Sequence, residues 1–146
     1  MSVTNPKMVI PDRVLVIDDS DIARAAIVGI LTDGNFVVFE QPSAIGATRA
    51  IREHAIRAVV VDISMPGLSG DKLLGVLRKN QRLDGLVIVI VSARSSSELA
   101  TMNELRDADA VMPKADLATD LVRTLTRLLR GSRFRPSENF ATSGDR

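Results

Sequence analysis

Residues 59–67 read VVVDISMPG, an apolar run that stops at the carboxylate of Asp62 and is followed by the turn residues Pro66 and Gly67. Consecutive β-branched residues are typical of a strand that is buried on both faces, as in a parallel sheet, and a Pro-Gly pair cannot continue such a strand. Asp62 is therefore expected where a buried strand opens into a loop. Ligands of open α/β sheets bind along that edge, so the residues that end the other strands bear on function.

The composition fits one folded domain. The chain has 146 residues, 45% of them hydrophobic, which is enough for one core, and a second folded domain is not expected. The net charge of +1 gives no overall reason to expect nucleic acid, and the longest apolar run, residues 86–91, is too short to cross a bilayer. The absence of cysteine excludes disulfides, thiolate metal sites and cysteine nucleophiles. Residues 1–11 lack the apolar core of a secretory signal, so we expect a cytoplasmic protein.

Short apolar runs alternate with segments of helical periodicity along the whole chain. The predicted strands are residues 13–17, 36–40, 57–62, 86–91 and 108–112, and the predicted helices are residues 23–33, 42–54, 69–80, a segment that starts at 95, and 116–131. This alternation requires right-handed crossovers and a parallel sheet covered on both faces. We therefore predict a doubly wound α/β fold with a five-stranded parallel sheet in the order 2-1-3-4-5, the flavodoxin-like arrangement.

The two ends of the chain lack such periodicity. We expect a flexible leader over residues 1–12, a folded domain over residues 13–130 and a flexible polar tail over residues 131–146. Among the helices, Ser95 and Glu98 are spaced as a capping box, and Asp116 is placed to cap the last helix. The inward positions predicted for the third and the last helix are Leu73, Leu74, Val76 and Leu77, and Leu117, Leu121, Leu125 and Leu128.

Polar side chains follow four of the five predicted strands. They are Asp18 and Asp19 after the first strand, Asp62 after the third, Ser92 after the fourth and Lys114 after the fifth. Because parallel strands all point the same way, these side chains are expected at one end of the sheet, around the central third strand. Only the second strand, at the edge, adds nothing to this crevice. Taken singly, each aspartate is better explained as a helix cap or a turn residue, and only the joint placement indicates a site.

Three neighbouring carboxylates repel one another and tend to be protonated unless a cation is present. The predicted ligands are all oxygen atoms, with no cysteine and no nearby histidine, which favours Mg²⁺ or Mn²⁺ over zinc. An aspartate, a hard cation, a lysine and a hydroxyl are the parts needed to transfer a phosphoryl group to a carboxylate. The sequence therefore suggests an acyl phosphate on Asp62.

In the order of these motifs, the chain resembles the receiver domains of two-component response regulators, from about Arg13 to Arg130. The similar stretches are VLVIDDS at 14–20, VVDISMPGLSG at 60–70, VSA at 91–93 and MPK at 112–114. The resemblance implies a domain that takes a phosphoryl group from a sensor histidine kinase or a histidine phosphotransfer protein and signals through protein contacts. It also implies that the domain phosphorylates and dephosphorylates its own aspartate, without turnover of a small-molecule substrate.

The resemblance also gives individual residues a role. As catalytic residues it implies Asp62, the phosphorylated nucleophile, with Ser92 and Lys114 on the phosphoryl oxygens and the small Ala93 leaving room for them. As metal ligands it implies Asp19 directly, Asp18 largely through water, Asp62, and the backbone carbonyl of Ser64. The implied switch positions are Ser92 and Val111, and the positions that tune the lifetime of the phosphate are Ser64 and Arg94.

Two positions depart from the family pattern. Val111 stands where the family usually has an aromatic residue that reports the switch. Lys114 is followed by Ala115 and preceded by Pro113, whereas the family lysine is commonly followed by a cis-proline, so a different strand-five loop is expected.

Three other functions remain open from the sequence: a phosphate shuttle within a relay, a Mg²⁺-dependent aspartyl phosphatase for small molecules, and a degenerate receiver that binds partners without phosphorylation. The only histidine, His54, is expected at an exposed helix end. The arginines of the last helix and the tail are expected to form a solvated face rather than a nucleic-acid site.

Overall fold

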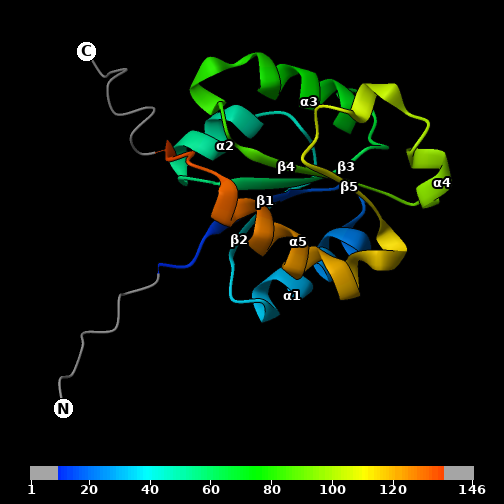
Figure 1. The fold of residues 1–146 in the computed structure, drawn as a ribbon, viewed down its shortest axis with the longest axis horizontal. Helices are drawn as coiled ribbons and strands as arrows, with labels where there is room; N and C mark the ends of the chain where they lie inside the picture. Colours follow the sequence, from blue (N-terminus) through cyan, green and yellow to red (C-terminus); the bar gives the residue numbers. More distant parts are fainter. Residues whose placement is uncertain (1–9, 137–146) are drawn as a thin grey trace.

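A parallel sheet of five strands forms the middle of the molecule in the computed structural model, which describes residues 10–136 (Figure 1). The strand order is β2-β1-β3-β4-β5, as predicted. The strands are β1 (Arg13–Ile17), β2 (Val37–Gln41), β3 (Ala58–Asp62), β4 (Val87–Ser92) and β5 (Ala110–Pro113). Every residue of β3 and β4 is buried, because both strands are covered by helices on their two faces.

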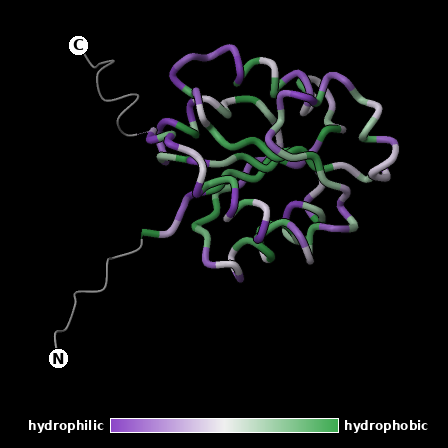
Figure 2. The backbone as a smooth tube through the Cα atoms, viewed as in Figure 1, coloured by the Kyte–Doolittle hydropathy of each residue, from purple (hydrophilic) through white to green (hydrophobic). Residues whose placement is uncertain are grey.

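Helices cover both faces of the sheet. They are α1 (Asp21–Asp33), α2 (Ala47–Glu53), α3 (Gly70–Lys79), α4 (Ser96–Leu99) and α5 (Leu117–Gly131), with short 3₁₀ turns η1 (Gln81–Leu83), η2 (Asn103–Leu105) and η3 (Lys114–Asp116). Helices α1 and α5 lie on one face, and α2 and α3 lie on the other (Figure 1). Two apolar cores result, one on each side of the strands, and Figure 2 shows the hydrophobic strands enclosed by more polar helices and loops. The predicted doubly wound α/β fold is confirmed.

Several element boundaries differ from the prediction. Helix α2 begins at Ala47 rather than at residue 42 or 43, because Gly46 has a left-handed φ of 81° and the Gln41 side chain holds the carbonyls of Ser43 and Ile45 in a loop. Helix α4 is a single turn, with the predicted capping box of Ser95 and Glu98. The other strands and helices begin or end within about two residues of their expected limits.

Two predicted details of the helices are wrong. Asp116 makes no capping hydrogen bond, since it belongs to the 3₁₀ turn that precedes α5. Val76 is half-exposed, and Leu129 rather than Leu128 completes the buried stripe of α5, which recurs every four residues from Leu117.

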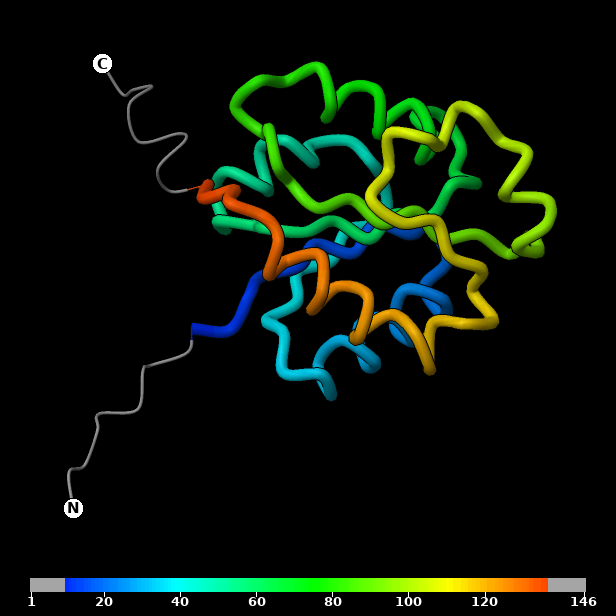
Figure 3. The backbone as a smooth tube through the Cα atoms, in the orientation of Figure 1, coloured from blue at the N-terminus to red at the C-terminus, as the bar shows by residue number. Residues whose placement is uncertain are grey.

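The chain beyond α5 packs onto the end of the sheet where the strands begin. Phe134 is only 2% exposed and belongs to the core beneath α2 and α3. The Arg57 guanidinium donates to the carbonyls of Leu129, Ser132 and Phe134 and pairs with Asp12 at 2.7 Å. Figure 3 shows the first and last described segments side by side at this end. The expected tail is thus packed over residues 132–134, whereas residues 1–9 and 137–146 lie outside the described part of the chain.

Within residues 10–136, no helix combines the length and the apolar character needed to span a membrane.

Candidate functional site

Three carboxylates meet where β1 and β3 end. One oxygen each from Asp18, Asp19 and Asp62 lies within 4.8 Å of the others. They come together because β1 and β3 pair in parallel with Ile17 opposite Val61, so both strands reach the sheet edge at the same level. Asp18 and Asp62 are buried and Asp19 is exposed, which opens the cluster to solvent on one side. The structure thus brings together the three aspartates predicted from the sequence.

The turn between β1 and α1 is built by hydrogen bonds of its own residues. The Ser20 amide donates to Asp18 Oδ1 at 2.9 Å, and Ser20 Oγ accepts from the Ala23 amide at 3.2 Å, which caps α1. The side chain that caps this helix is therefore that of Ser20 rather than of Asp18 or Asp19. Both aspartates are left to face the crevice.

Lys114 brings the only positive side chain paired with this cluster within the described residues. Its Nζ lies 2.9 Å from Asp18 Oδ2 and 3.7 Å from Asp62 Oδ1. The shorter contact lacks hydrogen-bond geometry, so Asp18 Oδ2 is the one fully buried side-chain oxygen or nitrogen in residues 10–136 without a hydrogen-bond partner. A buried carboxylate oxygen in this state is a ready acceptor for a ligand.

The surroundings of Asp62 act on its carboxyl in opposite directions. Burial is the largest influence and raises the pKa of Asp62 above its ordinary value, with Asp18 and Asp19 adding to the rise. The Lys114 ammonium and the backbone N–H of Ser64 lower the same pKa, but less than the other groups raise it. The pKa of Asp62 is therefore raised mainly because the buried carboxylate is poorly solvated.

These observations fit a hard divalent cation. The cluster offers three carboxylates against one ammonium, and the buried Asp18 Oδ2 has an ion-pair partner but accepts no hydrogen bond. Oxygen ligands suit Mg²⁺, which keeps several waters in proteins, so not all three carboxylates need to contact the ion directly.

Strands β4 and β5 place the remaining predicted residues near this edge. Val91 lies opposite Asp62, and Ser92 lies opposite Pro113. Ser92 and Lys114 are therefore the residues next to these pairs at the carboxyl end of the sheet. Ser92 is buried, and its Oγ accepts from the Arg94 amide at 3.0 Å. Pro113 ends β5 and Lys114 begins a 3₁₀ turn, and residues 10–136 contain no cis peptide.

Arg94 and Val111, two of the predicted site residues, lie next to Met102. The Arg94 guanidinium contacts Met102 Sδ at 3.3 Å. Val111 is partly buried in β5 and lines a hollow of about 340 Å³ with Leu99 and Met102.

His54 follows α2 and is half-buried, whereas an exposed position was expected. Its ring stacks on that of Phe39, with 4.4 Å between the ring centroids.

The sequence interpretation missed two features of the site. Gly70 starts α3 so close to β3 that a Cβ there would lie 2.5 Å from the Asp62 carbonyl oxygen, and the Ser-Gly pair before an apolar helix was the available signal. Arg24 donates to the Asp18 carbonyl at 2.7 Å and to Glu40 of β2 at 3.0 Å. A tertiary contact of this kind leaves no local pattern in the sequence.

Comparison with known proteins gives one consistent family. Residues 14–126 match the family model described as the response regulator receiver domain. The chain is 30% identical over 119 residues to the two-component response regulator ORR5 of Oryza sativa subsp. japonica, covering 81% of this chain and 89% of that protein. It is 30% identical over 147 residues to the transcriptional regulatory protein PrrA of Mycobacterium tuberculosis, covering 97% of this chain but 58% of that protein.

Solved structures share the fold. A sensor protein from a Polaromonas species superposes with a TM-score of 0.72 at 27% identity, over 82% of this chain and 97% of that chain. The response regulator TrrA from Thermotoga maritima superposes with a TM-score of 0.72 at 23% identity, over 80% of this chain and 98% of that chain.

Proposed function

The chain belongs to the family of response regulator receiver domains, and on that premise we propose that Asp62 accepts a phosphoryl group in a Mg²⁺-dependent reaction. The donor is the phosphohistidine of a sensor histidine kinase or of a histidine phosphotransfer protein. The observation that carries the proposal is the cluster of Asp18, Asp19 and Asp62 within 4.8 Å, with the Lys114 ammonium beside it. The phosphorylated domain then signals through contacts with another protein in the cytoplasm.

The transfer uses the Asp62 carboxylate as the nucleophile. One Asp62 oxygen forms a bond to phosphorus while the phosphorus–nitrogen bond of the donor breaks, and the bonding electrons leave with the imidazole. The raised pKa of Asp62 follows mainly from its burial, and a buried anion without full solvation is the more nucleophilic for it. The product is an aspartyl phosphate, which water later hydrolyses.

The carboxylates of Asp18, Asp19 and Asp62 and the backbone carbonyl of Ser64 would hold the Mg²⁺ ion, or Mn²⁺ in its place. A bound divalent ion supplies positive charge against the phosphoryl oxygens. The response regulator TrrA was crystallised in complex with Mg²⁺ and beryllium fluoride, which supports the proposal that this chain binds Mg²⁺ together with a phosphoryl group. The buried Asp18 Oδ2, which accepts no hydrogen bond, supports a ligand role for this residue.

The other residues act on the phosphoryl group or on its consequences. Lys114 Nζ and Ser92 Oγ donate hydrogen bonds to phosphoryl oxygens, and Ser92 and Val111 carry the switch. Ser64 and Arg94 set the lifetime of the phosphate. The Arg94 backbone amide donates a hydrogen bond to Ser92 Oγ, which supports an effect of residue 94 on the hydroxyl that binds the phosphoryl group.

The test is the intact mass of the protein after incubation with acetyl phosphate and Mg²⁺. Wild type should gain one phosphoryl group, chelation of Mg²⁺ should prevent the gain, and hydroxylamine should remove it, as it cleaves acyl phosphates. Asp62→Asn should gain nothing. The control Asp71→Asn, which alters a carboxylate in the first turn of α3, should behave as wild type. No gain by wild type, with no binding of Mg²⁺, contradicts the proposal and favours a degenerate receiver.

The same phosphorylated protein separates the remaining alternatives. Rapid transfer of its phosphoryl group to a histidine phosphotransfer protein indicates a shuttle, and retention indicates a switch. Turnover of generic phosphate esters indicates a small-molecule phosphatase.

A further inference from the structure

Arg24 of α1 bonds the first residue of its own helix, the β1–α1 turn and β2 through one guanidinium. Its Nη1 donates to the Asp18 carbonyl at 2.7 Å, its Nε to Glu40 Oε1 at 3.0 Å, and its Nη2 to Asp21 Oδ1 at 2.6 Å. The side chain is only 14% exposed, so most of its surface is in contact with the protein. The planar fork of an arginine suits such a fixed, multiple contact.

The bond to the Asp18 carbonyl bears on the orientation of two proposed metal ligands. This carbonyl belongs to the peptide unit that joins Asp18 to Asp19. Because a peptide unit is planar, the direction of its carbonyl also fixes the position of the Asp19 Cα atom. The Ser20 amide holds Asp18 Oδ1, and the Ser20 carbonyl accepts from the Arg24 amide at 2.8 Å. These two bonds do not involve the Asp18 carbonyl, which the Arg24 guanidinium holds instead.

Glu40 connects this arrangement to the edge of the sheet. It lies in β2 opposite Val16 of β1, two residues before Asp18, and its Oε1 accepts from Arg24. Strand β2 carries no predicted ligand, but through Glu40 it fixes the guanidinium that supports the turn.

We propose that Arg24 is a positioning residue of the metal site, anchored by Glu40, and that it sets the affinity for Mg²⁺ by holding the Asp18–Asp19 peptide. The proposal rests on the proposed function, because it assumes that the carboxylates bind Mg²⁺. Groups that orient metal ligands in this way typically change metal affinity by roughly ten- to hundredfold when they are removed.

The sign of the effect separates positioning from charge. Removal of a cation near three carboxylates should, by charge alone, strengthen the binding of Mg²⁺. Loss of positioning should weaken it. Arg24→Gln removes both the charge and the fork, and Arg24→Lys keeps the charge and loses the fork, so weaker binding by both variants is expected only from positioning.

The experiment is a calorimetric titration of the metal-free full chain with Mg²⁺. We expect Arg24→Lys and Arg24→Gln to bind roughly ten- to hundredfold more weakly than wild type, and phosphorylation by acetyl phosphate to recover at saturating Mg²⁺. The amide NMR signals of Asp18, Asp19 and Ser20 should shift in the metal-free variants. The control Arg49→Lys changes an exposed arginine that pairs with Glu53 within α2 and should bind Mg²⁺ as wild type does.

The outcomes distinguish the two proposals. If wild type binds no Mg²⁺, the proposed function fails. If wild type binds and both Arg24 variants bind equally well or more tightly, the positioning role is overturned and the proposed function stands. If the Arg24 variants do not fold, Glu40→Gln decides, because it frees the guanidinium without removing it: weaker Mg²⁺ binding supports the role, and unchanged binding overturns it.

Discussion

Lys114 Nζ lies closer to Asp18 Oδ2, at 2.9 Å, than to Asp62 Oδ1, at 3.7 Å. In the metal-free protein the ammonium therefore neutralises mainly the carboxylate of Asp18, at the end of β1. We predict that Lys114→Met destabilises the metal-free protein by about 1–3 kcal/mol, since it leaves buried carboxylates without a partner. Urea unfolding at neutral pH measures the loss.

Mg²⁺ should restore most of the stability lost in Lys114→Met, because the cation supplies the missing positive charge to the same carboxylates. The matched control is Lys72→Met on the exposed side of α3, which should change stability by no more than about 0.5 kcal/mol. Equal losses in the two variants would show that the Lys114 contacts do not stabilise the fold.

The raised pKa of Asp62 predicts how stability depends on pH. Because the pKa in the folded protein lies above the ordinary value of 3.8, the folded state binds more protons than the unfolded state between the two values. The free energy of unfolding of metal-free wild type should therefore fall as the pH rises through this interval and then level off. Asp62→Asn lacks this contribution, so it should be the more stable protein at neutral pH.

Melting temperatures of wild type and Asp62→Asn between pH 4 and pH 8, with the metal chelated, check this prediction. Addition of Mg²⁺ should raise the melting temperature of wild type more than that of Asp62→Asn. A wild type that gains stability relative to Asp62→Asn as the pH rises would contradict the assigned direction of the pKa shift.

Two glycines of α3 should respond to alanine in opposite ways. A Cβ at Gly70 would lie 2.5 Å from the Asp62 carbonyl oxygen and 2.8 Å from Ile63 Cα, so α3 or β3 would have to shift. We predict that Gly70→Ala destabilises the protein by about 1–3 kcal/mol and slows phosphorylation of Asp62. Gly75 has no atom within 4 Å of its added Cβ, and Gly75→Ala should stabilise the helix by about 0.5–1 kcal/mol. Unfolding midpoints of the two variants measure the difference.

The sheet was predictable because its strands are buried on both faces. A strand such as β3 (Ala58–Asp62) must then be apolar until it stops where the chain leaves the core. The apolar runs therefore locate the strands, and the common flavodoxin-like order of such sheets brings Asp18, Asp19 and Asp62 to one edge. Helix α2 was less predictable. Its start depends on the left-handed φ of Gly46 and on the Gln41 side chain, neither of which leaves a periodic pattern.

The contacts of Arg24 beside the acidic cluster could not be predicted from local sequence patterns. Arg24 and Glu40 are ordinary helix and strand residues in sequence, and only the register of β2 against β1 brings them together. Likewise, the polar composition after α5 indicated a tail, whereas the Arg57 guanidinium holds two carbonyls of that segment, those of Ser132 and Phe134.

Phe134 gives the strongest test of that packed segment. It is 2% exposed, and the neighbouring Ser132 Oγ donates to the Gly85 carbonyl at 2.6 Å, which fixes the chain beneath the core. We predict that Phe134→Ala costs about 3 kcal/mol of stability, since it empties a buried aromatic position. Arg133→Ala, an exposed change next to it, should cost no more than about 0.5 kcal/mol.

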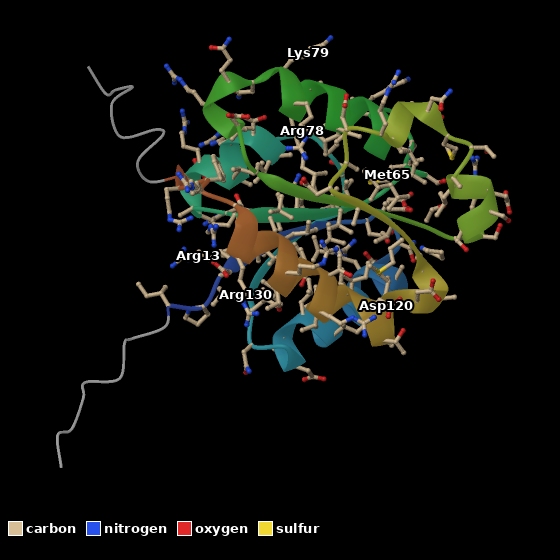
Figure 4. The ribbon with its side chains drawn as sticks, in the orientation of Figure 1. Arg13, Met65, Arg78, Lys79, Asp120 and Arg130 are labelled. Carbon is tan, nitrogen blue, oxygen red and sulfur yellow. The ribbon has the colours of Figure 1, made fainter. Side chains whose placement is uncertain are left out.

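The same pair of variants tests whether the two ends of the sheet act independently. Figure 4 labels Arg13 at the start of β1 and Arg130 near the end of α5, and both lie at the end of the sheet where the strands begin. Phe134 packs at this end, whereas the acidic cluster lies where the strands finish. Phe134→Ala should therefore accept a phosphoryl group from acetyl phosphate at the wild-type rate under conditions in which it remains folded. A slower rate in folded Phe134→Ala, with Arg133→Ala unchanged, would mean that packing of the segment after α5 is coupled to the site through β3, the strand that begins next to Arg57 and ends at Asp62.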